Sequence, residues 1–104
     1  MADTIIKIDL SKSAYDHDNV HNRWHPDIPM VAKVKPGDDF IVECFDWTGG
    51  QIKNDDDASD VRDVDLSQVH FLSGPIAVEG AQPGDLLEVD ILDIGAFTEQ
   101  QWGF

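Results

Sequence analysis

Apolar and polar residues alternate over short stretches of this chain, and turn-forming residues separate the stretches. Alternation with a period of two places every second side chain on one face of an extended chain, so it predicts β-strands. The predicted strands span residues 4–10, 30–34, 40–48, 76–79 and 86–94. Residues 66–72 fit a strand or a turn, and one helical turn is expected around 59–64. Because no longer 3.6-residue pattern occurs, the sequence predicts a mainly-β sandwich or barrel with little helix.

A weak internal repeat accompanies the two strongest predicted strands. Lys35-Pro36-Gly37-Asp38 precedes the first, and Gln82-Pro83-Gly84-Asp85 precedes the second. Each strand then ends in a carboxylate, at Asp46 and, 47 residues later, at Asp93. Proline presets φ and glycine accepts positive φ, so Pro-Gly-Asp is a common way to enter a strand. This turn chemistry explains the repeat more simply than a duplication does.

Composition and charge narrow the function classes. The chain has 104 residues, enough for one domain, with 21 Asp and Glu against 7 Lys and Arg, a formal net charge of −14. This charge argues against binding a nucleic-acid backbone or an anionic membrane surface. The single cysteine, Cys44, allows neither an intrachain disulfide nor a cysteine-based zinc cluster. The acidic start of the chain lacks the apolar region of a secretory signal, so a cytoplasmic location is expected.

Three histidines carry the first candidate site. His17, His21 and His25 are four residues apart, which places them on one side of a helix or of an extended chain. Neutral imidazoles are good zinc ligands, and nearby carboxylates can orient them. The H-E-x-x-H pattern is absent, because Asp18 stands where the Glu would be. A hydrogen-bonded polar loop explains the same residues, and both interpretations stay open.

Asp46 is the second candidate, because it ends a row of alternate residues formed by Phe40, Val42 and Cys44. A carboxylate that ends an apolar row must be paired, hydrogen-bonded or bound to a metal. Capping of the following glycine turn explains it equally well. Cys44 in this row is expected to be a buried core residue rather than a nucleophile. The acidic run at 55–57 and Asp60 is expected to be a solvated loop, because it fails the calcium-loop pattern.

Several stretches, taken in order and spacing, are more specific than any single motif. They include residues 21–29 (His-Asn-Arg-Trp-His-Pro-Asp-Ile-Pro), 34–38 (Val-Lys-Pro-Gly-Asp) and 45–52 (Phe-Asp-Trp-Thr-Gly-Gly-Gln-Ile), then Gly74-Pro75-Ile76 and residues 79–95. Together they resemble the N-terminal part of the acetamidase/formamidase family, and the resemblance covers nearly the whole chain. Family members are several times longer than this chain. Residues 1–104 are therefore expected to form a single N-terminal β-rich domain, a truncated part of a longer amidase.

The resemblance implies a β-sandwich or jelly-roll-like N-terminal region and an amidohydrolase activity. The implied reaction converts formamide, or another short aliphatic amide, to the carboxylic acid and ammonia. The implied assembly is a cytoplasmic homo-oligomer, or a chain completed by the missing C-terminal region. The alternative is a non-catalytic β domain that associates with full-length subunits or binds a cation. Because a fragment leaves sheet edges and apolar faces uncovered, the isolated chain is expected to be marginally stable or oligomeric.

The resemblance also suggests site residues at matching positions. Asp46, His25 and Gln51 are the expected catalytic set, with His25 in an acid/base role and Gln51 as an amide contact. His21 and Asp46 are the expected ligands of a divalent metal such as zinc, which would activate water and polarise the carbonyl. No organic cofactor is expected.

Overall fold

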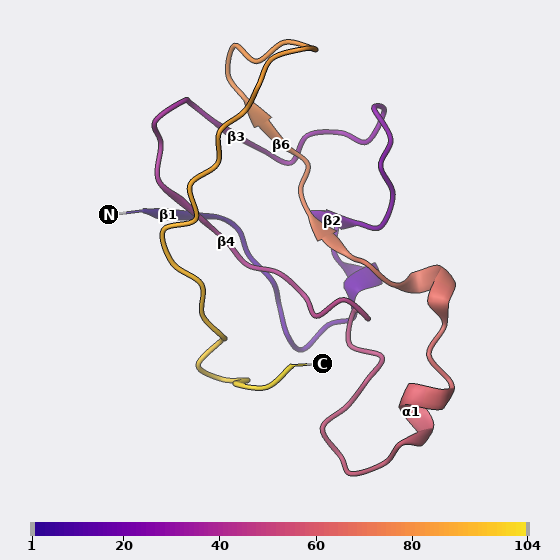
Figure 1. Ribbon diagram of the computed structural model, residues 1–104. Coiled ribbons are helices and arrows are strands. Elements are labelled where there is room, and N and C mark those ends of the chain that lie inside the picture. Colours follow the sequence, from indigo (N-terminus) through magenta and orange to yellow (C-terminus); the bar gives the residue numbers. More distant parts are fainter. Residues whose placement is uncertain (1, 104) are drawn as a thin grey trace.

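Short strands joined by long irregular segments make up the fold (Figure 1). The computed structural model describes residues 2–103. In chain order the elements are β1 (Asp3–Ile6), η1 (Ala14–Asp16), β2 (Val20–His21), β3 (Ala32–Val34), β4 (Phe40–Val42), α1 (Ser59–Arg62), η2 (Leu66–Gln68), β5 (Leu72–Ser73) and β6 (Ile76–Val78). The elements η1 and η2 are single 3₁₀ turns. The prediction of a mainly-β chain with little helix is confirmed.

The strands pair across long stretches of sequence. β1 pairs with β4 in parallel, β2 pairs with β5 antiparallel, and β3 pairs with β6 in parallel. The two parallel ladders need long crossover connections, because parallel strands cannot be joined by a short hairpin. The strands of the antiparallel ladder are also far apart in the sequence, so each ladder closes a large loop. Within residues 2–103 the three ladders are separate two-stranded pairs. The sandwich layers are therefore not assembled by these residues alone.

Three strand predictions need correction. The strand predicted at 40–48 ends at Val42, although the N–H of Glu43 still donates to the Ile6 carbonyl at 3.0 Å. The next backbone donor of the facing chain, the N–H of Ile8, bonds to the side-chain Oε1 of Glu43 at 2.8 Å. Residues 86–94 join no ladder in the part of the chain that the structure describes. Conversely, β2 lies in a region predicted to be loop.

The two repeat turns have the same hydrogen bonds. The backbone N–H of Lys35 donates to Asp38 Oδ2 at 2.8 Å, and the N–H of Gln82 donates to Asp85 Oδ2 at 2.8 Å. In each turn the aspartate N–H returns a bond of 3.0 Å to the carbonyl of the first residue. Gly37 and Gly84 adopt φ values of 92° and 95°. β3 precedes the first turn and β6 precedes the second, and these two strands pair with each other in parallel. The sequence repeat therefore has a structural counterpart.

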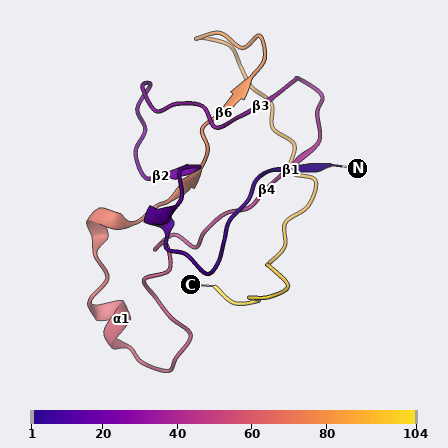
Figure 2. The same ribbon diagram turned by 180° about the vertical axis from the view of Figure 1, so that it is seen from behind.

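The core of the chain is small. Its buried apolar side chains are Ile6, Ile8, Ala14, Val34, Ile52 and Val69, and the side chain of Thr48 is also fully buried. The radius of gyration is 15.5 Å, whereas a compact domain of this length has about 13 Å. Seen from behind, the chain after β6 runs along one side of the molecule to the C-terminus without joining a labelled strand (Figure 2). Most of the chain therefore lies at the surface.

The closest packing in the fold surrounds Gly49. A Cβ atom at this position would lie 2.5 Å from Cε2 of Phe71 and 3.0 Å from the Cβ of Ala14. Phe71 also packs edge-on against Tyr15, with ring centroids 5.4 Å apart. Since η1 supplies Ala14 and Tyr15, this contact attaches the Gly49 turn to η1 and to the chain before β5.

Two glycine variants separate crowding from backbone strain. Gly49 and Gly50 both have positive φ, 68° and 92°, but a Cβ at Gly50 meets nothing within 4 Å. We expect Gly50→Ala to lower the free energy of unfolding by about 1–2 kcal/mol through strain alone. Gly49→Ala should lose a further ~1–3 kcal/mol, because the methyl group overlaps Phe71. Urea denaturation of both variants measures the difference, and equal losses would contradict the packing described for Gly49.

Candidate functional site

The carboxylate of Asp46 organises the turn that follows it. Its Oδ1 accepts hydrogen bonds from the N–H of Thr48 at 2.8 Å and from the Thr48 hydroxyl, and its Oδ2 accepts one from the N–H of Gly50 at 3.0 Å. The N–H of Gly49 donates to the Asp46 carbonyl at 3.0 Å. Both carboxylate oxygens are therefore engaged within the turn. Of the two interpretations of Asp46, turn capping is the one that the geometry supports.

The side chain of Gln51 joins this turn to η2. Its Nε2 donates to the carbonyls of Gln68 at 2.9 Å, Thr48 at 3.2 Å and Asp65 at 3.3 Å. Its Oε1 accepts the N–H of Asp65 at 2.8 Å. The amide group of Gln51 is thus used on both sides to hold the backbone. This arrangement favours a positioning role for Gln51 over direct contact with a substrate.

His21 and His25 lie on one stretch of chain, residues 20–27, which we call the His21 arm. Their surroundings differ. His21 is half-buried in β2, opposite Leu72 of β5, and its Nδ1 accepts the N–H of Arg23 at 3.3 Å. The next residue, Asn22, donates its side-chain amide to the carbonyl of Ser67 at 3.2 Å. The His21 arm and the Gln51 side chain therefore both bind the backbone of residues 65–68.

His25 lies farther out on this arm. Its side chain is exposed, and its Nδ1 accepts the N–H of Asp27 at 3.1 Å. Acceptance at Nδ1 places the proton of the neutral ring on Nε2. In this form the imidazole can donate a hydrogen bond from Nε2. Donating a proton requires the imidazolium, in which Nδ1 also carries a hydrogen and the bond from the Asp27 N–H is broken. The acid/base role of His25 stays a prediction.

The third histidine of the sequence motif is structural. The Nδ1 of His17 lies 2.8 Å from the carbonyl of Ser13, and its Nε2 accepts the N–H of Asp9 at 3.0 Å. The ring also packs edge-on against Phe45, with centroids 4.8 Å apart. Both nitrogens are therefore used to join two loops, so the four-residue spacing does not bring the three histidines to one ligand position.

The described residues do not fit a metal ion as they lie. Among residues 2–103 no group of three His, Cys, Asp or Glu side chains is placed to hold one. The nitrogen of His21 that carries no hydrogen, Nδ1, already accepts the N–H of Arg23, whereas a metal would need this lone pair. The oxygens of Asp46 are engaged in its turn. A zinc site using His21 and Asp46 remains a prediction, and no step below depends on it.

The acidic loop uses its carboxylates to shape the backbone. Asp55 Oδ1 accepts the N–H of Asp57 at 3.2 Å, and Asp57 Oδ1 accepts the N–H of Ser59 at 2.9 Å. Asp60 Oδ2 accepts the N–H of Lys53 at 2.7 Å, which closes the loop at the base of α1. Hydrogen bonds from the backbone and hydroxyl of Ser59 lower the pKa of Asp57. These contacts explain the acidic residues without a bound cation.

The prediction for Cys44 is wrong, because the cysteine is exposed. β4 ends two residues earlier, so the period-two row that would have carried Cys44 inward is interrupted. Its thiol makes only a long contact, 4.0 Å, to the carbonyl of Val42. No reactive role follows from exposure alone.

The sequence analysis missed three residues around this turn. His70 has a φ of 61°, donates its N–H to the Trp47 carbonyl at 2.6 Å and lies against the Trp47 ring, with centroids 5.5 Å apart. Tyr15 has its pKa raised by loss of hydration and by the charge of Asp65. A positive φ at histidine costs energy and marks a constrained position. No sequence signal distinguishes His70. The positions of Tyr15 and Trp47 near the Gly49-Gly50 turn become apparent only from the fold.

Comparison with known proteins shows to which family the chain belongs. The profile of the acetamidase/formamidase family matches residues 7–104. The chain is 69% identical over 102 residues to a protein named formamidase from Methylophilus methylotrophus, and 55% identical over 112 residues to an acetamidase from Mycolicibacterium smegmatis. The chain belongs to the acetamidase/formamidase family. This confirms the resemblance seen in the sequence motifs.

The comparisons also fix the extent of the match. They cover 97% of this chain and 25% of the Methylophilus formamidase, and 100% of this chain and 28% of the acetamidase. The chain thus spans about a quarter of the length of the curated relatives that it matches. A solved structure of a γ-lactamase from Delftia acidovorans superposes with a TM-score of 0.91 at 67% identity, over 94% of this chain and 24% of that one. The fold described above is therefore that of a segment of this family.

Membrane insertion through a helix finds no support in the fold. Among residues 2–103, no helix combines the length and the apolar character needed to cross a bilayer.

The Gln51 bridge predicts a charge-specific effect on stability. Gln51→Glu keeps the size of the side chain and its acceptor for Asp65 N–H, but it removes the donors to three carbonyls. We expect the free energy of unfolding to fall by about 2 kcal/mol, because the new carboxylate faces carbonyl oxygens. Gln82→Glu is the matched control, since Gln82 uses its backbone N–H in its turn, and it should change stability by less than ~0.5 kcal/mol. Equal effects in urea denaturation would show that the bridge contributes nothing.

Ser67 should control the ionisation of Asp65. The Ser67 hydroxyl, and then its N–H, donate to Asp65 Oδ1 at 2.6 and 2.9 Å and lower the pKa of this carboxyl. Ser67→Ala should raise the pKa of Asp65 toward its ordinary value, as read by NMR titration of the side-chain carboxyl. The stabilisation that Ser67 provides is present above the unfolded-state pKa and is lost as the pH falls through the folded-state pKa. Ser11→Ala, which affects Asp9 in the same way, should leave Asp65 unchanged.

Proposed function

We propose that this chain takes part in the hydrolysis of formamide, or of another short aliphatic amide, as the N-terminal β-rich domain of an amidase. The observation that carries the proposal is the 69% identity, over nearly the whole chain, to a protein named formamidase. Acetamidase and putative formamidase relatives, at 55% and 52% identity, support the same reaction class. Because the chain spans a quarter of these relatives, the complete site includes residues that this chain does not contain.

The reaction sets requirements that the present residues meet in part. Water attacks the amide carbon, a C–O bond forms, the C–N bond breaks, and the nitrogen leaves with a proton as ammonia. Amides resist this attack, so the site must remove a proton from water, stabilise the oxyanion and protonate the leaving nitrogen. His25 is exposed, and its imidazolium form, in which Nδ1 no longer accepts from the Asp27 N–H, could supply the proton for the leaving nitrogen and become neutral. We propose it as the proton donor.

Asp46 and Gln51 are proposed as positioning residues. Asp46 closes the turn that contains Gly49 and Gly50, and Gln51 ties this turn to η2 and so to the His21 arm. Misplacement of a reacting group by about 1 Å can cost ~100-fold in rate. Loss of either side chain would therefore act on turnover through the geometry of the turn. Homo-oligomer formation and a metal such as zinc remain predictions of the family resemblance.

Ammonia release tests the proposed function. The test proteins are the 104-residue chain alone and a chimera in which it replaces the matching quarter of the Methylophilus formamidase, each with and without zinc. We expect no turnover of formamide or acetamide by the chain alone and clear turnover by the chimera. In the chimera, His25→Ala should lower kcat by ~100-fold or more, as expected for the loss of a general acid.

The positioning variants have a matched control and a second readout. Gln51→Ala and Asp46→Asn in the chimera should lower kcat more than they raise KM, whereas Gln82→Ala should retain wild-type kinetics. The pH profile of kcat should keep its shape in Gln51→Ala and change its shape in His25→Ala, because only His25 is proposed to transfer a proton in the reaction. A folded chimera without activity, beside an active parent formamidase, would instead favour the non-catalytic domain.

A further inference from the structure

Residues 86–94 have the pattern of a strand without its neighbours. Leu87, Val89 and Ile91 lie on one side of the extended chain, and Leu86, Leu92 and Ile94 lie on the other. All six are exposed, from 56% for Leu87 to 96% for Leu86. Apolar residues on both sides are typical of strands that are covered on both faces. In residues 2–103, nothing pairs with this segment in a ladder.

The solvent-accessible area of the chain shows how much more surface is exposed than in a compact monomer of the same mass. Its solvent-accessible area is 8155 Å². A folded monomer of its mass, 11.6 kDa, exposes about 5,800 Å². The excess of about 2,300 Å² is well above the ~800 Å² that one partner contributes to a standard interface. The cover that is missing is therefore extensive.

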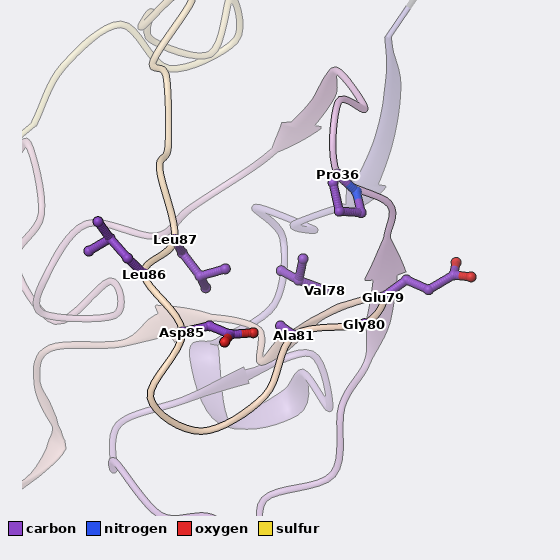
Figure 3. Close-up of a pocket in the computed structure, with 8 residues that line it drawn as sticks. All are labelled: Pro36, Val78, Glu79, Gly80, Ala81, Asp85, Leu86 and Leu87. Atoms are coloured by element: carbon purple, nitrogen blue, oxygen red, sulfur yellow. The ribbon is translucent and has the colours of Figure 1, made fainter.

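A hollow at the start of the segment offers a place for an apolar side chain. It has a volume of about 310 Å³ and lies between the two Pro-Gly turns (Figure 3). Its lining includes the apolar residues Pro36, Val78, Leu86 and Leu87, and the carboxylate of Glu79 points away from them (Figure 3). Leu86 and Leu87, the first residues of the exposed segment, form part of its wall. A polypeptide that covers residues 86–94 therefore also reaches this hollow.

The internal repeat supplies the geometry of the missing neighbour. The first Pro-Gly-Asp turn leads into β4, and β4 pairs in parallel with β1. Phe40, Ile41 and Val42 form this ladder, and the residues 47 positions later are Leu87, Glu88 and Val89. The N–H of Glu43 continues the pairing by donating to the Ile6 carbonyl at 3.0 Å, and its counterpart is Asp90. The second turn has the same hydrogen bonds as the first, so it directs the following residues in the same way.

We propose that residues 86–94 are a β-strand whose ladder is completed by a strand from the three-quarters of the family's length that this chain does not contain. The incoming strand pairs in parallel over Leu87–Val89, as β1 pairs over β4. Its neighbours cover both apolar faces of the segment, and an apolar side chain fills the hollow beside Pro36. The proposal concerns assembly, and its test does not depend on amide hydrolysis.

A second copy of this chain fits the segment less well. Two copies related by a two-fold axis would pair these strands antiparallel, along one edge only. That contact would leave at least one apolar face uncovered. It would also bring together Glu88, Asp90 and Asp93 from both copies, each copy having a net charge of −14. The length of the relatives, about four times that of this chain, supplies a neighbour without these costs.

Amide hydrogen exchange, followed by mass spectrometry, tests the proposal. In the 104-residue chain, the amides of residues 86–94 should exchange at the rate of unstructured peptide. In the chimera with the Methylophilus formamidase, they should slow by at least about 100-fold, as in a paired strand. Equal exchange in the two proteins would overturn the proposal. Protection that appears in the chain alone as its concentration rises would also overturn it, in favour of a second copy.

A pair of variants with equal exposure makes the test specific. Ile91 and Leu66 are 72% and 70% exposed in this chain. In the chimera, Ile91→Asp should restore fast exchange of residues 86–94, whereas Leu66→Asp should leave their protection unchanged. A protected segment in Ile91→Asp would contradict the proposal. If the chimera fails to fold, the matching segment of the parent formamidase provides the measurement, and fast exchange there would overturn the proposal as well.

Discussion

The turn from Asp46 to Gln51 is the constraint on which the rest of the candidate site depends. Asp46 closes the turn through its own carboxylate, and Gln51 then fixes it to residues 65–68 through three hydrogen bonds to the backbone. The His21 arm reaches the same residues through Asn22. Gly49 allows Phe71 and Ala14 to pack directly on the turn. A small number of polar contacts thus replaces the large core that usually positions a site.

This mode of construction fits a segment of a larger protein. Over residues 2–103, six buried apolar residues and three short ladders hold the chain, while several apolar side chains remain in contact with water. In a family whose curated members are about four times as long, such surfaces are positions for further contacts. The proposed activity and the proposed strand pairing therefore both involve the rest of the enzyme. One concerns the chemistry of His25 and its neighbours, and the other concerns the completion of the sheet.

The sequence was informative where local chemistry decides the structure. The Pro-Gly-Asp turns, β1, β3, β6 and the helical turn at α1 follow from residue preferences that act over a few positions. The predictions for 40–48, 86–94 and Cys44 were wrong within the described residues because a ladder depends on the neighbouring strand as well as on the pattern. β2 was missed because it consists of two residues, too few for a periodicity. For the site, the sequence left Asp46 open between a turn cap and an active-site or metal role, and the bonds of Gln51 depend on tertiary contacts.

The two Pro-Gly-Asp turns, residues 35–38 and 82–85, show which positions of the sequence can vary. In both of them the first residue contributes only backbone atoms to the hydrogen bonds, while the side chain of the fourth residue accepts one. The first position is therefore open to substitution, and it carries lysine in one copy and glutamine in the other. Lys35 adds a cation to a strongly acidic chain at no cost to the turn. The charge of the surface can thus change at the first position of the turn while the side chain at the fourth position keeps the fold of the turn.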